Sequence, residues 1–255
     1  MKTFIKIKIA VVSISMLFIS CDLELQDTFE FESGANFSDP YENTTAWGFI
    51  QSLTTPVTED DNYNGEHFNY MEAAIRKAGM VDVYNQTADK NRTYLLLNNN
   101  AFVGNGDVIS IVTGSAATRE TVLDTNGDPV LDVDGNEVTV LLTPDEVFER
   151  VDTPEKLEKL QTLLKYHITL DYVQQVPTLA VSLSWYTFQT MIPGPDGVIA
   201  YRRDDDWDIG ININGSPMPR SATTGGWNEN VRNHNYVFNN GVGHIIADPV
   251  RNQPY

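Results

Sequence analysis

The order in which two hydrophobic patterns follow each other most strongly constrains the fold of this chain. Apolar residues recur at three- and four-residue spacings in residues 68–78 and 154–167, which predicts amphipathic helices that bury one face. After residue 185 the pattern changes to short β-branched and aromatic runs, separated by Pro-Gly, Asp-Gly and Asn-Gly pairs that favour turns. A few helices followed by many short strands indicate an α+β domain and not a doubly wound sheet.

The first twenty residues have the composition of an export signal. Three lysines precede an apolar run over residues 9–19, which is too short to span a bilayer comfortably. Ser20 then stands before Cys21, and the segment LFISC resembles a bacterial lipoprotein box. We therefore expect residues 1–20 to be a lipoprotein signal peptide and Cys21 to carry a lipid such as palmitate. The alternative is a plain signal peptide that a cysteine happens to follow.

The single cysteine and the charge of the chain restrict its stabilisation and its partners. With Cys21 alone there is no disulfide framework, so a hydrophobic core must supply the stability. The chain of 255 residues is long enough for one sizeable domain, or at most two small ones. Its formal net charge of −18 repels nucleic acid and anionic lipid head groups. We expect no nucleic-acid partner and a membrane contact made by the lipid alone.

Composition divides the chain into a tether, a domain and a short tail. Residues 21–46 are acidic and have no lasting helical or strand period, which indicates a tether. The acidic start of this segment is similar to signals that send some lipoproteins to the outer cell surface. We therefore expect a lipid-anchored protein of the outer membrane that faces the cell exterior. The folded domain is expected over residues 47–250, followed by a tail over residues 251–255.

Several elements of the domain have clear sequence signals. The helical stripe of residues 68–78 is followed by Gly79, which suits a left-handed C-terminal position. Tyr94–Leu97 is predicted to be a strand that enters an asparagine-rich turn. Thr143 and Thr153 each precede a proline, and we expect both threonines to cap helices.

Residues 115–142 contain two turn signals, Asn126-Gly127 and Asp134-Gly135, between β-branched and leucine runs. We expect tight hairpin turns there, in which both central residues have positive φ. The stretch DVDGNE also resembles part of a calcium loop, but it lacks the full set of alternating oxygen ligands and the closing glutamate. Hairpins are therefore favoured over a calcium site.

Four motifs in order resemble the fasciclin-type domain family, in its bacterial surface lipoprotein form, over roughly residues 47–249. They are the helix YMEAAIRKAGMVDVY, the strand and turn YLLLNNNAF with Asn100 and Phe102, LLKYHITL with Tyr166 and His167, and NNGVGHIIADPV with Asn240, Gly241 and His244. The insertion at residues 115–142 is longer than the family usually carries. The resemblance implies an α+β domain of two packed β-sheets with helices along one edge.

The resemblance also implies extracellular adhesion or scaffolding, with no catalytic centre and no cofactor. Lipoproteins of this kind often accompany outer-membrane glycan-uptake systems. We therefore expect a non-enzymatic, cell-surface adhesion module that engages protein or glycan through loops and strand edges. Its expected partners are outer-membrane or surface proteins, glycan or extracellular matrix. The alternatives are an accessory subunit of an outer-membrane glycan-uptake assembly and, third, a glycan hydrolase.

His167 continues the leucine stripe of the second predicted helix. We predict a buried histidine whose ring nitrogens are hydrogen-bonded to backbone. In the fasciclin family the Tyr-His pair is linked to cell adhesion, so the resemblance also makes Tyr166 and His167 binding candidates. Asn240-Gly241 predicts a tight primed turn, after which His244 is expected to pack beside isoleucines on a strand.

Catalytic and metal-binding patterns are weak in this sequence. There is no Gly-x-Ser-x-Gly elbow, the one cysteine is assigned to the anchor, and the four histidines have no metal-ligand spacing. Carboxylates are too numerous for a glycosidase pair to be singled out. We expect no enzyme activity, no cofactor and no metal site.

A mixed aromatic and charged segment is the better candidate for recognition. Sugar-binding sites place apolar C–H faces on aromatic rings and hydroxyls against charged groups. The stretch YRRDDDWDIG and a tryptophan further along supply both kinds of group. The candidate binding residues are Tyr201, Arg202, Arg203, Trp207 and Trp227. The alternatives are a strand end with core aromatics and solvated aspartates, or a calcium ion that three adjacent aspartates cannot all reach.

Overall fold

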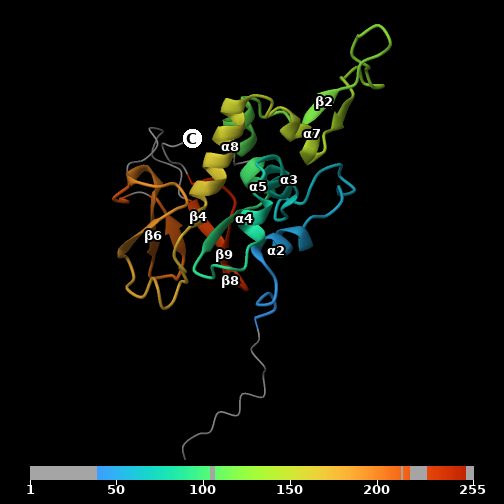
Figure 1. The fold of residues 1–255 in the computed structure, drawn as a ribbon. Coiled ribbons are helices and arrows are strands. Elements are labelled where there is room, and N and C mark those ends of the chain that lie inside the picture. The colour runs from blue at the N-terminus through green and yellow to red at the C-terminus, as the bar shows by residue number, and fades with distance from the viewer. Residues whose placement is uncertain (1–38, 104–106, 214, 219–228, 251–255) are drawn as a thin grey trace, which may run out of the picture. The chain divides into compact units, whose positions relative to one another are not determined.

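The computed structural model describes residues 39–250, apart from residues 104–106, 214 and 219–228 (Figure 1). The described residues belong to one compact unit that begins at Asp39, before the expected start of the domain at Trp47. Cys21, Trp227, the expected signal peptide and the expected tail lie outside the described residues.

Short helices precede most of the strands along the chain. The helices are α2 (Ala46–Ser52), α3 (Asn69–Lys77), α4 (Val81–Asn85), α5 (Asn99–Phe102), α6 (Val108–Thr113), α7 (Pro144–Glu149), α8 (Pro154–Tyr166) and the 3₁₀ turn η1 (Pro195–Gly197). The strands are β1 (Thr93–Leu97), β2 (Arg119–Thr121), β3 (Thr139–Leu141), β4 (Ile168–Thr169), β5 (Trp185–Gln189), β6 (Val198–Arg203), β7 (Ile209–Ile211), β8 (Glu229–Phe238) and β9 (Gly241–Ile246).

In the described part of the chain, the strands form a seven-stranded sheet in the order β4-β1-β9-β8-β7-β6-β5 and a two-stranded sheet of β2 and β3. Within the large sheet β1 and β9 are parallel, and the other neighbours are antiparallel. Its two ends also meet, because Thr169 in β4 bridges Thr190 just after β5, and the Leu170 N–H donates to Gln189 O at 2.8 Å. This closure protects part of the sheet edge from further pairing.

The predicted α+β class is confirmed, with a large sheet, helices beside it and a second sheet. The helices gather near β1, β4 and β9, while β5, β6 and β7 lie on the side away from α2–α5 (Figure 1). Every residue of β1 and β9 is buried. Parallel neighbours covered on both faces need continuous apolar runs, which TYLLL and GVGHII largely provide.

The helical signals of the sequence correspond to observed helices. The apolar stripe of α3 is buried, including Met71 and Ile75, and Gly79 follows the helix with a φ of +66°. Thr143 and Thr153 cap α7 and α8 with their side-chain oxygens, and the first of them forms a complete capping box. The strand predicted at Tyr94–Leu97 is β1. These predictions are confirmed.

Residues 119–142, which we call the arm, extend away from the helices (Figure 1). At the base of the arm β2 pairs with β3. Beyond this pair, the backbones of three valines, eight residues apart in sequence, form a closed ring of hydrogen bonds. The Val122 N–H donates to Val138 O, the Val130 N–H to Val122 O, and the Val138 N–H to Val130 O, each at 2.8 Å. The part of the arm beyond the β2–β3 pair is therefore held by its own backbone hydrogen bonds.

The predicted primed turns are wrong for both loops of the arm. Gly127 and Gly135 have φ values of +89° and +84°, but the residues before them are not in the positive-φ region. Each loop instead starts with an aspartate, Asp124 or Asp132, whose Oδ1 accepts the N–H groups two and four residues ahead. Because the side chain supplies these acceptors, only the glycine needs a left-handed backbone.

The turn between β8 and β9 also differs from the predicted primed turn. Asn240 does not have a positive φ, and Gly241 already belongs to β9. The Asn240 side chain is buried, where its Nδ2 donates to Tyr84 O at 2.9 Å and Tyr94 Oη at 3.1 Å. Its Oδ1 accepts the Ala46 N–H at 3.0 Å. The asparagine is thus required for packing between α2, α4 and β1, and not for its backbone conformation.

Replacement of Asn240 by alanine tests this role. The change leaves the Ala46 N–H and the Tyr84 carbonyl without their buried partner, and such groups cost about 1–3 kcal/mol each. We expect the free energy of unfolding, measured by urea denaturation, to fall by about 3 kcal/mol. Asn126→Ala on the exposed arm is the matched control and should change it by less than about 0.5 kcal/mol. Equal effects of the two changes would contradict the assignment.

Candidate functional site

Trp207 lies in the loop between β6 and β7 and is 53% exposed. This loop repeats the hydrogen bonds of the two arm loops. The Asp204 N–H donates to Asp208 O at 3.0 Å, and Asp204 Oδ1 accepts the Asp208 N–H at 2.8 Å. The corresponding distances are 2.8 and 3.0 Å in the loop that starts at Asp124, and 2.8 and 2.9 Å in the loop that starts at Asp132. The three loops share one backbone conformation.

Trp207 occupies the position that glycine has in both arm loops. Its φ is +71°, compared with +89° for Gly127 and +84° for Gly135. A residue with a Cβ atom is destabilised by about 1–2 kcal/mol in this left-handed region, and bulky side chains are uncommon there. The chain therefore carries a tryptophan at a position where the backbone favours glycine.

Arg203 orients the ring of Trp207. The guanidinium carbon lies 4.2 Å from the ring centroid, within the range of a cation–π contact. Arg203 is itself buried, and its guanidinium donates to the backbone oxygens of Leu179 and Ala180 at 2.9 Å and of Asp204 at 3.2 Å. These bonds connect the tryptophan loop to the chain that follows β4. The indole ring is therefore held against a fixed cation.

The chain that follows β4 also brings apolar side chains to this loop. Gln175 donates from its side chain to Trp207 O, and the Ser182 hydroxyl donates to the Asp205 carboxylate. Half or more of the surface is exposed in each of Val176, Val181 and Leu183. We refer to Val176, Val181, Leu183, Arg203 and Trp207 together as the tryptophan site.

Tyr166, His167 and Tyr201 are fully buried, so the recognition surface predicted at these residues is not formed. The Tyr166 hydroxyl donates to Val198 O and accepts from Asn212 Nδ2, both at 2.9 Å. Burial raises the pKa of the Tyr166 and Tyr201 hydroxyls, so both are neutral. These tyrosines pack and bond within the fold, and a partner has no surface to contact on them.

The ring nitrogens of His167 are both bonded to backbone, as predicted. His167 Nε2 accepts the Val250 N–H at 2.9 Å, which leaves the proton on Nδ1. His167 Nδ1 then donates to Leu163 O at 2.8 Å. The histidine ends α8 and connects this helix to the chain after β9. The predicted structural role of His167 is confirmed.

Arg202 lies apart from the tryptophan site. Successive residues of a strand point to opposite faces, so Arg202 faces away from Tyr201 and Arg203 on β6. Its guanidinium carbon is 5.2 Å from the ring centroid of Trp185, its cross-strand neighbour on β5. Of the predicted binding set, Arg203 and Trp207 are thus brought together and Arg202 is not. Trp227 is outside the described residues.

Two residues of the asparagine-rich motif belong to α5 and have packing roles. Asn100 Nδ2 donates to Glu66 Oε1 at 3.1 Å. Phe102 is buried, with its ring stacked on Tyr70 at a centroid distance of 6.0 Å. The motif therefore joins the chain before α3 to the end of β1.

His244 is packed on β9, as predicted, and is fully buried. Its Nδ1 accepts the Asn235 N–H at 3.2 Å, and its Nε2 donates to Val173 O at 2.8 Å. Burial lowers the pKa of the imidazole to about 4, with a smaller contribution from the nearby His234. The ring is therefore neutral in the folded protein at physiological pH.

Within the described ranges, no group of three histidine, cysteine or acidic side chains is placed to hold a metal ion. No helix among them is both long enough and apolar enough to cross a bilayer.

Among solved structures, a domain pair is similar to this chain. No family model matches the chain, and no curated protein matches it. A solved FAS1 domain pair from the insect cell adhesion molecule fasciclin I is similar over 82% of this chain and 51% of that chain, with 14% sequence identity and a TM-score of 0.42. The chain therefore spans about half the length of that domain pair. The α+β class rests on the strands and helices described above.

The buried His244 predicts acid sensitivity. The unfolded histidine has a pKa of about 6.5, whereas the pKa in the folded protein is about 4. Well above pH 6.5 neither state binds the proton, so this group leaves stability unchanged. As the pH falls from 6.5 to 4, only the unfolded state gains the proton, and stability falls by about 3 kcal/mol.

The variant His244→Gln tests this origin of the pH dependence. The variant has a lower unfolding free energy overall. The loss of unfolding free energy between pH 6.5 and pH 4 should be smaller in the variant by about 3 kcal/mol. Urea denaturation at half-unit pH intervals measures both slopes. A variant with the slope of the unmodified protein would refute the assignment to His244.

Proposed function

We propose that this protein is a cell-surface binding module of the adhesion type and that the tryptophan site is its recognition centre. The module is non-enzymatic and engages protein or glycan. A lipid on Cys21 holds it in the outer membrane, facing the cell exterior. The signal-like first twenty residues and the cysteine that follows them support the anchor.

The observation that carries the proposal is the backbone conformation of Trp207. Two loops of the same chain adopt this conformation with glycine, and the third adopts it with a half-exposed tryptophan. Strained backbone of this kind is concentrated at functional sites, because the surrounding structure must hold it in place. Since a glycine would serve the turn, the indole side chain is the part of the residue that needs a function.

The chemistry around the ring suits a ligand with apolar and polar groups. The indole and the exposed aliphatic residues offer a surface for C–H groups, while Asp205 and Asp206 add carboxylate acceptors beside it. A sugar ring or an apolar side chain of a protein ligand both meet these requirements. Arg203 fixes the ring before binding, which lowers the entropy cost of ordering it.

The variant Trp207→Gly separates binding from folding. Glycine relieves the left-handed strain but removes a cation–π contact of about 0.5–1 kcal/mol, so the unfolding free energy should change by less than about 1 kcal/mol. The same change should weaken ligand binding by roughly 30-fold or more, as expected for a central tryptophan. Glycan and matrix-protein arrays identify a ligand for the unmodified protein, and titration calorimetry then compares the variants.

The matched control for this experiment is Val57→Ala, which shortens an exposed apolar side chain in a different part of the chain. We expect its binding to equal that of the unmodified protein. If Trp207→Gly keeps full affinity for every ligand found, the tryptophan site is not the recognition centre.

The lipid anchor has its own test. Cells that express the full chain and are fed an alkyne-labelled fatty acid should incorporate label into the protein, and Cys21→Ser should abolish it. The variant should then leave the membrane fraction, because no charge attraction to anionic lipid holds a chain with a net charge of −18. Membrane retention without label would show that another contact anchors the protein.

A further inference from the structure

The arm exposes four aliphatic side chains. Its exposed aliphatic residues are Leu123 at 58%, Leu131 at 57%, Val133 at 102% and Val140 at 51% exposure. The ring of hydrogen-bonded valines lies in the same segment and orders its backbone. Exposed aliphatic side chains on a segment with an ordered backbone can cover apolar groups of a ligand without further ordering of that backbone.

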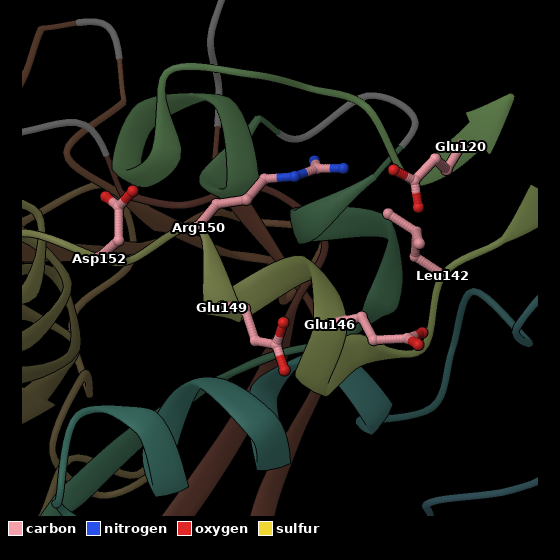
Figure 2. Close-up of a pocket in the computed structure, with 6 residues that line it drawn as sticks. All are labelled: Glu120, Leu142, Glu146, Glu149, Arg150 and Asp152. Carbon is pink, nitrogen blue, oxygen red and sulfur yellow. The ribbon is translucent and has the colours of Figure 1, made fainter. Parts of the chain in front are cut away.

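A second feature lies at the base of the arm. A cleft of about 410 Å³ separates the β2–β3 pair from α7 and the turn that follows it (Figure 2). It is lined by Glu120, Leu142, Glu146, Glu149, Arg150 and Asp152. The cleft therefore combines four carboxylates with one guanidinium, and the arm and the cleft are continuous through β2.

Three of the charged side chains that line the cleft already form hydrogen bonds or ion pairs within the protein. Arg150 donates to Ala117 O, Glu146 accepts from Thr143, and Asp152 pairs with Lys156 at 2.8 Å. Those bonds leave the carboxylates of Glu120 and Glu149, both exposed, as the groups offered to a ligand.

Glu120 and the exposed Val140 lie directly opposite each other on the β2–β3 pair. Cross-strand partners share one face of a sheet, so an acidic group and an apolar group stand side by side next to the cleft. Between Arg119 and Leu142 the chain has one arginine and six carboxylates. A complementary ligand must therefore carry positive charge and aliphatic groups close together.

We propose that the arm and the cleft bind a segment of another protein, in which a lysine or arginine is flanked by aliphatic residues. The basic side chain enters the cleft between Glu120 and Glu149. The aliphatic residues cover Val140 and the exposed leucines of the arm. This surface is separate from the tryptophan site, and the inference does not depend on the function proposed for that site.

Charge complementarity selects this occupant over two others. A second copy of the chain would bring a second strongly acidic surface against the first, since each chain has a formal net charge of −18. An anionic membrane surface is repelled for the same reason. A basic and apolar protein segment gains from both the carboxylates and the exposed aliphatic side chains.

A photo-crosslinking experiment in the native cells tests the inference with the full chain. Benzoylphenylalanine replaces Val133 or Val140, which are exposed, and in a matched control it replaces Val57. After irradiation, we expect one discrete protein adduct from each arm position and none from the control. Mass spectrometry of the adduct should place the crosslinked peptide of the partner within a few residues of a lysine or arginine.

The pair of changes Glu120→Gln and Glu149→Gln then tests the role of the cleft. Both residues are exposed, and thermal melting checks that the fold is retained. In this background the yield of adduct should fall about tenfold, which matches the loss of charge-assisted contacts. An adduct with a second copy of the chain or with lipid, an adduct of undiminished yield, or no adduct at either arm position would each overturn the inference.

Discussion

The amide side chain of Asn240 joins parts of the chain that lie far apart in sequence. It bonds to Ala46, Tyr84 and Tyr94, whose sequence separations from it are 194, 156 and 146 residues. With Cys21 as the single cysteine, no disulfide makes such connections. Buried side chains that satisfy distant backbone groups take their place, and His167 and His244 do the same at the end of α8 and on β9.

The sequence predicts elements of this fold better than it predicts their turns. Helical stripes and buried strands were predictable because the spacing of apolar residues follows directly from which face is buried. The conformation of the arm loops was not predictable, because Asn-Gly and Asp-Gly pairs fit two turn types. The aspartate three residues before each glycine determines which turn type forms. The closure of the sheet at Thr169 and Thr190 depends on long-range register, which no local pattern encodes.

The candidate site was predictable only in part. Tyr201, Arg202 and Arg203 are consecutive on a strand, so alternation alone prevents them from forming one surface. Trp207 is not subject to this alternation, because it lies in a loop. The signal that identifies it in the sequence is the spacing of Asp204 and Asp208, which repeats the spacing of the first and fifth residues in both arm loops. Trp207 lies at the position that glycine has in the arm loops, and the aligned sequences of the three loops are enough to identify it.

The hydrogen bonds around Thr44 have a mechanical consequence. The Asn239 N–H donates to Thr44 O at 3.0 Å, and the next segment of the chain is held by Asn240. A pull applied through the residues before Asp39 therefore reaches the turn between β8 and β9, directly beside the buried pair of β1 and β9. Load on this side therefore enters the sheet at the turn between β8 and β9. Such a connection suits a domain that must stay folded while it is pulled from its N-terminal side.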